Sequence, residues 1–378
     1  MIRQAVPSIV RALAVALLAA AWVAPSFAQS QGSWLDNDDM LLLYEALTKV
    51  EQLSIAPETE GGMAHKAIKG YLRQLDPYCD LLTPAEYGRY QEAMSDRYAG
   101  VGMEIFGDRA GRVVCLPYPG GAADRAGIGY GDELLFVDGK PVEGRSLYLV
   151  GADIRGPVST SVSITVRSAS GEVKNPVLVR QAVERSSVAV ADLGGLAVIR
   201  IFHFDARTDA ELGRALAGLD RNAVKVIDLR GNTGGDFHAG VRSAALFLEP
   251  GTVIVDKRTK TQMHTFRSGE GDKNRSPLVL WQDGYTASAA EVFVGALTGN
   301  GRAVSVGEQS YGKGVAQAVV ELSDGSVMFV TDGALRTPKG DYYHQRGLDP
   351  DYLLARAGRA ECLDATRELI RTGRVPGL

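Results

Sequence analysis

The stretch 278–317 decides the fold and reads LVLWQDGYTASAAEVFVGALTGNGRAVSVGEQSYGKGVAQ. Its apolar start, residues 278–281, predicts a buried strand. Ser288 stands before a helix-like segment, residues 289–297, which a glycine-rich turn closes. Residues 303–306 then return to strand character. This alternation of strands and helices, which continues along the chain from about residue 190, predicts an α/β core.

Two residues of this stretch suggest a Ser-Lys hydrolase. Ser288 is at the start of the helix, and Lys313 has a glycine on each side. A serine hydroxyl is a weak nucleophile that needs a base, and lysine can act as the base only when neutral. Its ordinary pKa of about 10.4 leaves roughly one amine in a thousand or fewer neutral at pH 7. The flanking glycines allow close backbone approach, and burial would lower that pKa.

Gln317 is four residues beyond Lys313 and offers a hydrogen bond to the amine without adding a negative charge. A carboxylate in its place would keep the lysine protonated. If residues 313–319 form a strand, positions 313 and 317 share one face, because side chains alternate with a period of two. The spacing therefore predicts that Gln317 orients the amine of Lys313.

The motifs T-A-S-A-A-E (286–291) and Y-G-K-G-V-A-Q (311–317) resemble the catalytic segments of the carboxyl-terminal processing peptidases, also called tail-specific proteases. Those enzymes carry an S-A-S-x-S-E-like run and then F-G-K-G, with a glutamine four residues after the lysine. The resemblance implies a crotonase-like peptidase core with Ser288 as nucleophile, Lys313 as base and Gln317 as the orienting residue.

A second motif, D-L-R-G-N-T-G-G (228–235), resembles the family's D-L-R-x-N-x-G-G turn. By that resemblance, the oxyanion hole is formed by the N–H of Gly234 or Gly235 and the N–H of Ala289. The alternative is a glycine turn that serves only chain reversal. Asp228 and Arg230 are expected to brace the turn. Nearby His238 has no partner pattern that would support a Ser-His site.

Residues 98–185 resemble a PDZ domain. The run Y-A-G-V-G-M (98–103) matches the loop and strand that bind a peptide's C-terminal carboxylate through backbone N–H groups, beside which the peptide adds as a strand. The G-x-G alone is weak, but the following strands, the G-A-A-D-R-A-G-I turn and a helix over 146–154 strengthen the match. The predicted peptide-binding residues are Gly100, Val101, Gly102 and Met103. Those expected to face the groove, with ordinary domain core as the alternative, are Val101, Met103, Ile105, Leu147 and Val150.

Residues 1–28 are expected to be a signal peptide, because a basic start precedes an apolar stretch and the small-x-small run Ser26-Phe27-Ala28. The alternative is an uncleaved membrane anchor, for which the apolar run is short. A periplasmic or otherwise exported location follows from the signal peptide.

Residues 34–95 are expected to form an N-terminal helical segment, with helices over about 38–54, capped by Asn37, then 64–75 and 83–94. Such helices either pack on a neighbouring subunit, as they often do in the family, or cap the core. Between the last two helices, L-D-P-Y-C-D resembles the family's L-D-P-H-S-x-Y-L, with Tyr78 and Cys79 in place of histidine and serine. This replacement is not expected to touch the triad.

The remaining composition excludes several functions. A formal net charge of −4 argues against nucleic-acid binding. Three cysteines and five histidines, all scattered, give neither a disulfide framework nor zinc spacing, so the cysteines are expected to be small buried hydrophobes. No cofactor and no metal is implied. The peptidase core is expected over 186–356, with a C-terminal helix and tail over 357–378.

The sequence thus predicts an exported serine endopeptidase that recognises substrate C-termini through its PDZ domain and cleaves peptide bonds through an acyl-enzyme. Its partners would be proteins or peptides with free C-termini. A homo-oligomer through the N-terminal helices and a regulatory adaptor are left open. Two alternatives remain: a non-catalytic peptide-binding protein that has kept the peptidase shape, and an enzyme that is latent until the PDZ domain is engaged.

Overall fold

The computed structural model describes residues 38–55, 62–94, 98–182 and 186–378, and the chain divides into two units, 1–64 and 65–378. The expected signal peptide and the Asn37 cap lie outside the described residues. In the first unit, α1 (Asp38–Leu53) buries none of its side chains. Among the described helices, none is long and apolar enough to cross a membrane.

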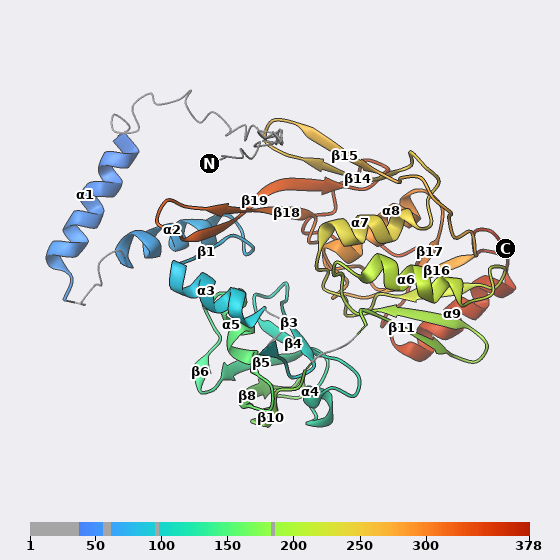
Figure 1. Cartoon of the computed structure of the whole chain (residues 1–378), viewed down its shortest axis with the longest axis horizontal. Coiled ribbons are helices and arrows are strands. Elements are labelled where there is room, and N and C mark those ends of the chain that lie inside the picture. Colours follow the sequence, from blue (N-terminus) through green and yellow to red (C-terminus); the bar gives the residue numbers. More distant parts are fainter. Residues whose placement is uncertain (1–37, 56–61, 95–97, 183–185) are drawn as a thin grey trace, which may run out of the picture. The chain divides into compact units, whose positions relative to one another are not determined.

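A six-stranded sheet forms the centre of the second unit (Figure 1). Its strands, in spatial order, are β11 (Val188–Asp192), β12 (Ala197–Ile201), β13 (Lys225–Asp228), β16 (Leu278–Gln282), β17 (Val304–Gly307) and β20 (Tyr352–Leu353). Neighbours from β12 to β20 are parallel, and β11 is antiparallel to β12. All five residues of β16 are buried, as expected for the middle of a parallel sheet covered on both faces.

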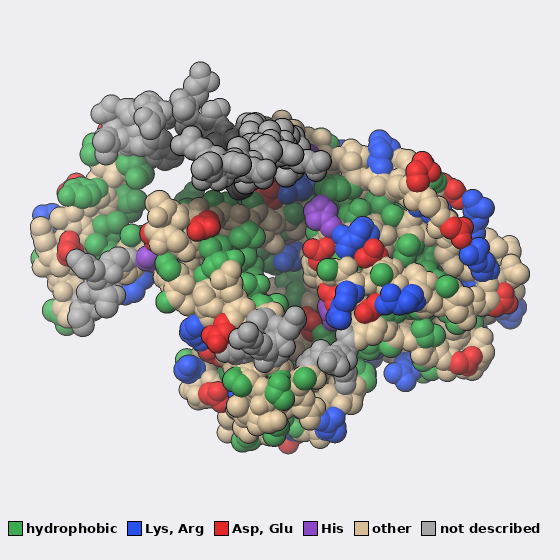
Figure 2. Space-filling view, viewed as in Figure 1, with side chains coloured by type: hydrophobic (Ala, Val, Ile, Leu, Met, Phe, Trp, Pro, Cys, Tyr) green, Lys and Arg blue, Asp and Glu red, His purple; other side chains and the backbone are tan. Residues whose placement is uncertain are grey.

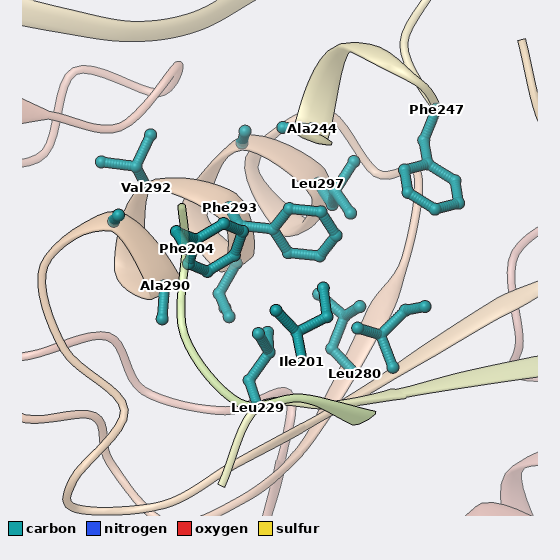
Figure 3. Packing of buried hydrophobic residues seen from close by; sticks show 14 of the residues in the cluster. Ile201, Phe204, Leu229, Ala244, Phe247, Leu280, Ala290, Val292, Phe293 and Leu297 are labelled. Atoms are coloured by element: carbon teal, nitrogen blue, oxygen red, sulfur yellow. The ribbon is translucent and has the colours of Figure 1, made fainter. Parts of the chain in front are cut away.

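Helices cover both faces of this sheet. On one face lie α6 (Thr208–Ala217), α7 (Phe237–Ala245) and α8 (Ala289–Gly299), and on the other lies α9 (Arg359–Arg371). Figure 3 shows Phe293 and Leu297 of α8 packed over strand residues that include Ile201 and Leu280. Each such fully buried side chain contributes about 1.5–3 kcal/mol relative to an exposed one. This packing fixes the start of α8 against the sheet.

A five-stranded sheet includes a strand from before the PDZ-like region. Its strands are β1 (Asp80–Leu82), β19 (Val327–Arg336), β14 (Val253–Arg258), β15 (Met263–Arg267) and β18 (Val315–Glu321). Because β1 pairs with β19, the chain first contributes a strand to this sheet and then forms the PDZ-like region as an insertion. The expected helical segment 34–95 is therefore divided: α2 (Gly62–Leu75) leads into β1, and α3 (Pro84–Ala93) follows it with a Thr83–Glu86 capping box.

The inserted region has its own sheet and core. Its strands are β3 (Met103–Gly107), β4 (Val113–Pro117), β5 (Asp132–Val137), β6 (Lys140–Pro141), β8 (Ser161–Arg167), β9 (Val173–Lys174) and β10 (Val177–Val179), accompanied by α4 (Ala122–Arg125), α5 (Leu147–Ile154) and the β2–β7 pair (Tyr98–Ala99 with Gly156–Pro157). β3 is an edge strand of this sheet, and α5 packs near it. An edge strand beside a helix is where a PDZ domain adds a peptide.

Candidate active site

Ser288 stands at the sharp turn between β16 and α8. Its φ of +56° and ψ of −119° lie in a region that residues other than glycine seldom adopt. Strain of this kind is concentrated at functional sites and needs surrounding structure to hold it. The packing of α8 on the sheet provides that support, and the serine remains half-buried at the start of the helix, as predicted.

Glu291, one turn into α8, joins the backbone of Ser288 to that of Lys313. Its Oε2 accepts hydrogen bonds from the Ser288 N at 2.9 Å and the Lys313 N at 2.8 Å. Its Oε1 accepts from the Gly312 N at 2.7 Å and the Ser310 Oγ at 2.5 Å. Burial raises the pKa of this carboxyl group to about 7, and the four donors oppose that rise. Sequence reasoning missed Glu291, although a serine followed three residues later by glutamate is a capping-box signal.

Lys313 lies in a loop and not in a strand. β18 begins at Val315, and its pairing with β19 shifts register between Ala316 and Gln317. The prediction that positions 313 and 317 share a strand face is therefore wrong, because the strand starts two residues after Lys313. Gln317 instead donates from Nε2 to the Thr331 Oγ1 at 3.3 Å.

The flanking glycines do allow close approach. A Cβ on Gly312, whose φ is +95°, would lie 2.7 Å from the Gly347 N, and a Cβ on Gly314 would lie 2.7 Å from the His344 N. Any larger residue would push this loop away. The close approach buries the amine, and burial lowers the pKa of Lys313, while Asp76 and Glu291 act in the opposite direction.

The amine of Lys313 has an aromatic neighbour. Within the described parts of the chain it makes no hydrogen bond or ion pair, so it is bonded neither to Ser288 nor to a carboxylate. The ring centroid of Tyr78 lies 4.6 Å from Nζ. The expectation that the Tyr78-Cys79 replacement does not touch the triad is therefore wrong, since the β1–β19 pairing brings this segment to the site.

The two glycines of the D-L-R-G-N-T-G-G turn have different surroundings. Gly234 lies beside Ser288, because a Cβ there would be 2.7 Å from the Ser288 Cβ and 3.0 Å from the Ala289 N. Its own N–H donates to the Asn232 Oδ1 at 2.9 Å, and its carbonyl accepts from the Phe204 N at 2.8 Å. In a trans peptide the C=O and N–H point in opposite directions. The N–H of Gly235, which is exposed, therefore points away from Phe204.

The charged residues of this turn bind each other. Asp228 accepts from the Arg230 Nε at 2.8 Å and from its Nη2 at 2.7 Å, and both side chains are buried. The guanidinium also lies 4.9 Å from the Trp281 ring centroid. These contacts brace the turn and leave neither group available for catalysis. His238 contacts the rings of Phe237 and Phe266.

Two backbone carbonyls of the predicted carboxylate-binding loop accept hydrogen bonds from elsewhere in the PDZ-like region. The Val101 carbonyl accepts from the Ala123 N, and the Gly102 carbonyl accepts from the Tyr118 N, both at 2.9 Å. The N–H groups of Gly102 and Met103 belong to the same two peptides and point the opposite way. The side chains of Val101 and Val150 are 1% and 0% exposed in the core of this region, so they do not line a groove.

The cysteines are free and buried, as expected for small hydrophobic residues. Burial raises the pKa of Cys115 to about 12 and that of Cys362 to about 12, so neither is a reactive thiolate. Among the described residues, no group of three or more His, Cys, Asp or Glu side chains could hold a metal ion.

Comparison with known proteins agrees with this arrangement. The model of peptidase family S41 matches residues 195–354, and the PDZ domain model matches residues 92–167. The carboxyl-terminal-processing protease of Synechocystis sp. is 35% identical over 300 residues, which cover 76% of this chain and 70% of that protein. The chain belongs to the carboxyl-terminal-processing proteases of family S41.

Other relatives support the same family and fold. The "Probable CtpA-like serine protease" of Staphylococcus aureus (strain N315) is 33% identical over 76% of this chain. The chain spans 59% of the length of that relative. Among solved structures, the photosystem II D1 C-terminal processing protease aligns with a TM-score of 0.68 and 29% identity, over 84% of this chain and 93% of that one. Mature CPAF, at 13% identity and a TM-score of 0.51, shares the fold.

In this chain, the PDZ domain contacts the segments on either side of the candidate site. Arg109, after β3, donates from Nη2 to the Ser310 carbonyl at 2.7 Å and from Nε to the Tyr311 carbonyl at 3.0 Å. Glu104 of β3 accepts from the Thr233 Oγ1 at 3.0 Å. The strand to which a peptide would add is therefore linked to the loop before Lys313 and to the turn with the two glycines.

Proposed function

We propose that this chain is a serine endopeptidase in which Ser288 attacks a peptide carbonyl and Lys313 takes the proton from its hydroxyl. The observation that carries the proposal is the shared Glu291 carboxylate, which holds the backbone of both residues on one oxygen. The lowered pKa of Lys313 supports the same role, because a base must lose its proton near neutral pH.

The reaction would proceed in two steps. In the first, the serine oxygen bonds to the carbonyl carbon, the proton passes through Lys313 to the leaving amine, and an acyl-enzyme remains. In the second, Lys313 takes a proton from the attacking water and passes it to the Ser288 oxygen as the ester C–O bond breaks, which releases the new carboxyl terminus. The negative oxygen in each step would lie near the N–H groups of Ala289 and Gly235. Losing one such donor typically costs about a hundredfold or more in rate. Gly235 is the better candidate, because the N–H of Gly234 is already bonded to Asn232.

Peptide recognition would follow from the free edge of β3. A substrate C-terminus would pair with this strand, and its carboxylate would accept from the N–H groups of Gly102 and Met103. An exported, periplasmic location is proposed from the signal-like sequence of residues 1–28. A homo-oligomer through α1 is proposed because the apolar residues of that helix are exposed.

An assay of casein or a tailed peptide tests the activity. The wild-type protein should cleave it, and both Ser288→Ala and Lys313→Ala should abolish cleavage. If the wild type is as inert as the variants, the chain is a non-catalytic peptide-binding protein.

One observation favours a latent enzyme as the second candidate. The amine of Lys313 is not bonded to Ser288, and Gln317, the proposed orienting residue, is bonded to Thr331. Latency predicts that cleavage appears only after a peptide with a free C-terminus, or an adaptor that presents one, is added. Equal rates with and without the peptide would exclude it.

A further inference from the structure

The segment L-D-P-Y-C-D (75–80) is held firmly at the peptidase site. Asp76 Oδ1 accepts from the Tyr78 N at 2.8 Å and from the Cys79 N at 2.9 Å, which fixes the turn after α2. Asp80 then begins β1, which pairs with β19. The turn and the strand together leave Tyr78 and Cys79 little freedom, so what their side chains contact is set by the fold.

Tyr78 faces the amine of the proposed base. Its ring centroid lies 4.6 Å from the Lys313 Nζ, which has no polar partner within the described residues. Burial and a side-chain hydrogen bond with Tyr311 raise the pKa of Tyr78, so its hydroxyl stays neutral. The ring of Tyr311 in turn lies edge-on to Phe106 of β3, with centroids 4.6 Å apart. Aromatic rings therefore lie on one side of the Lys313 amine, and they extend from Tyr78 through Tyr311 to Phe106 of the PDZ domain.

Cys79 faces the partner of the proposed orienting residue. Its Sγ accepts from the Thr331 N at 3.3 Å, and the Thr331 Oγ1 accepts from the Gln317 Nε2 at 3.3 Å. Tyr78 thus contacts Lys313 directly, and its neighbour Cys79 is linked to Gln317 through Thr331. These are the two positions at which this sequence departs from the L-D-P-H-S pattern.

We propose that Tyr78 is a positioning residue for the general base: its ring forms the wall that shields the Lys313 amine from water and sets where the amine rests. Cys79 supports the same segment from the Thr331 side. The inference rests on the proposed function, because it assigns Tyr78 a role in the same reaction.

The physical argument is a balance of opposing influences on the amine. Asp76 and Glu291 favour the charged form, and so does the face of an aromatic ring. Two further titratable groups lie near the Tyr78 ring. They are Tyr311, which shares a side-chain hydrogen bond with Tyr78, and His344, whose ring centroid is 6.2 Å from that of Tyr78. The pKa of Lys313 is nevertheless lowered, with burial as its first cause, so exclusion of water outweighs all of these attractions. Removing the ring would admit water and raise that pKa.

The test compares Tyr78→Ala and Tyr78→Leu with Tyr78→Phe, which keeps the ring. Tyr87→Ala is the matched control, because this half-buried tyrosine of α3 stacks on Tyr90 in a separate cluster. The midpoint of the rising limb of kcat/KM against pH is measured on the full chain. The pKa of Lys313 is also measured directly, by NMR titration of protein labelled with [ε-13C]lysine and assigned with Lys313→Arg.

Tyr78→Ala should raise both midpoints by about one pH unit, which lowers the neutral fraction of the amine, and with it kcat/KM at pH 7, about tenfold. Tyr78→Leu should shift them in the same direction by less, and it carries the test if Tyr78→Ala does not fold. Tyr78→Phe and Tyr87→Ala should leave both unchanged. Unchanged midpoints in Tyr78→Ala and Tyr78→Leu, or an equal shift in Tyr87→Ala, would overturn the proposal. The NMR titration decides even if the wild type cleaves nothing, so failure of the proposed function is a distinct result.

Discussion

At the scale of single residues, the site depends on a buried carboxylate that is not itself part of the proposed chemistry. Ser288 is held in a strained conformation and Lys313 in a loop, and both backbone N–H groups end on Glu291. A group that is 0% exposed and accepts four hydrogen bonds cannot be replaced by one with fewer acceptors without leaving donors unpaired. The geometry of the site therefore depends on the charge and shape of this side chain.

Glu291→Gln should lower kcat/KM at least about tenfold, because a glutamine has one oxygen where four donors converge, and each unpaired buried donor costs about 1–3 kcal/mol. The same variant should change how stability depends on pH. The folded pKa is raised to about 7, so this group's contribution is fully present below its ordinary value and is lost as pH rises toward 7. The loss amounts to about 3 kcal/mol.

Urea unfolding at pH 5 and pH 8 measures this contribution. The wild type should lose stability over that interval relative to Glu291→Gln. Glu361→Gln is the control, because Glu361 occupies the same third position of α9 but is exposed. An identical pH dependence in the wild type and Glu291→Gln would contradict the assignment.

At the scale of elements, β3 is connected to both the glycine turn and the loop before Lys313. Its Glu104 contacts the glycine turn, and Arg109 at its end contacts the carbonyls before Lys313. A peptide that adds to β3 would therefore pair with a strand that is already linked by hydrogen bonds to the loop before Lys313 and to the glycine turn. This arrangement gives a physical route by which occupancy of the PDZ domain could change the position of the lysine.

Arg109→Ala should lower kcat/KM about tenfold, because hydrogen bonds from a charged donor contribute about 1.5–3 kcal/mol. It should leave the affinity for a C-terminal peptide within about twofold, since Arg109 lies outside the predicted carboxylate loop. Steady-state kinetics and fluorescence anisotropy measure the two quantities. Arg112→Ala is the matched control, because this exposed arginine of the same turn pairs with Asp108 and not with the loop before Lys313 in the part of the chain that the structure describes. Equal losses in both variants would mean that the contact with the loop does not matter.

At the scale of the whole molecule, the helix of the first unit, α1, has exposed apolar side chains. None of its side chains is buried, and Leu42 and Leu53 are 64% and 76% exposed. Figure 2 shows hydrophobic side chains along this helix. An amphipathic helix obtains most of its stability from packing its apolar residues, and the proposed homo-oligomer would bury those of α1 against a second copy of the chain.

Light scattering during size-exclusion chromatography tests this association. The wild type should be a dimer or larger, and Leu42→Glu with Leu53→Glu should give a monomer, because each places a charge where apolar contact is needed. Gln52→Glu adds a charge on the same exposed helix and should leave the assembly intact. A monomeric wild type would rule out the association.

The sequence alone was enough to propose Ser288 as nucleophile, Lys313 as base and the glycine turn as part of the site, because each lies in a short motif whose chemistry demands that residue type. It also determined the α/β core, since continuous apolar runs such as 278–281 are buried on both sides. Glu291 could have been found from its capping-box spacing from Ser288. Its contacts with Gly312 and Lys313 could not, because they join segments more than 20 residues apart in the chain.

Only the tertiary structure decided which residues surround the lysine. The pairing of β1 with β19 brings Tyr78 to Lys313 across more than 200 residues of sequence, and no local pattern encodes that register. The pairing of β18 with β19 likewise places Gln317 opposite Thr331, to which its side chain donates. The sequence shows which residue types a site could use, because each motif is local. Which side chains lie next to one another depends on strand pairing, and strand pairing depends on the packing of the whole core.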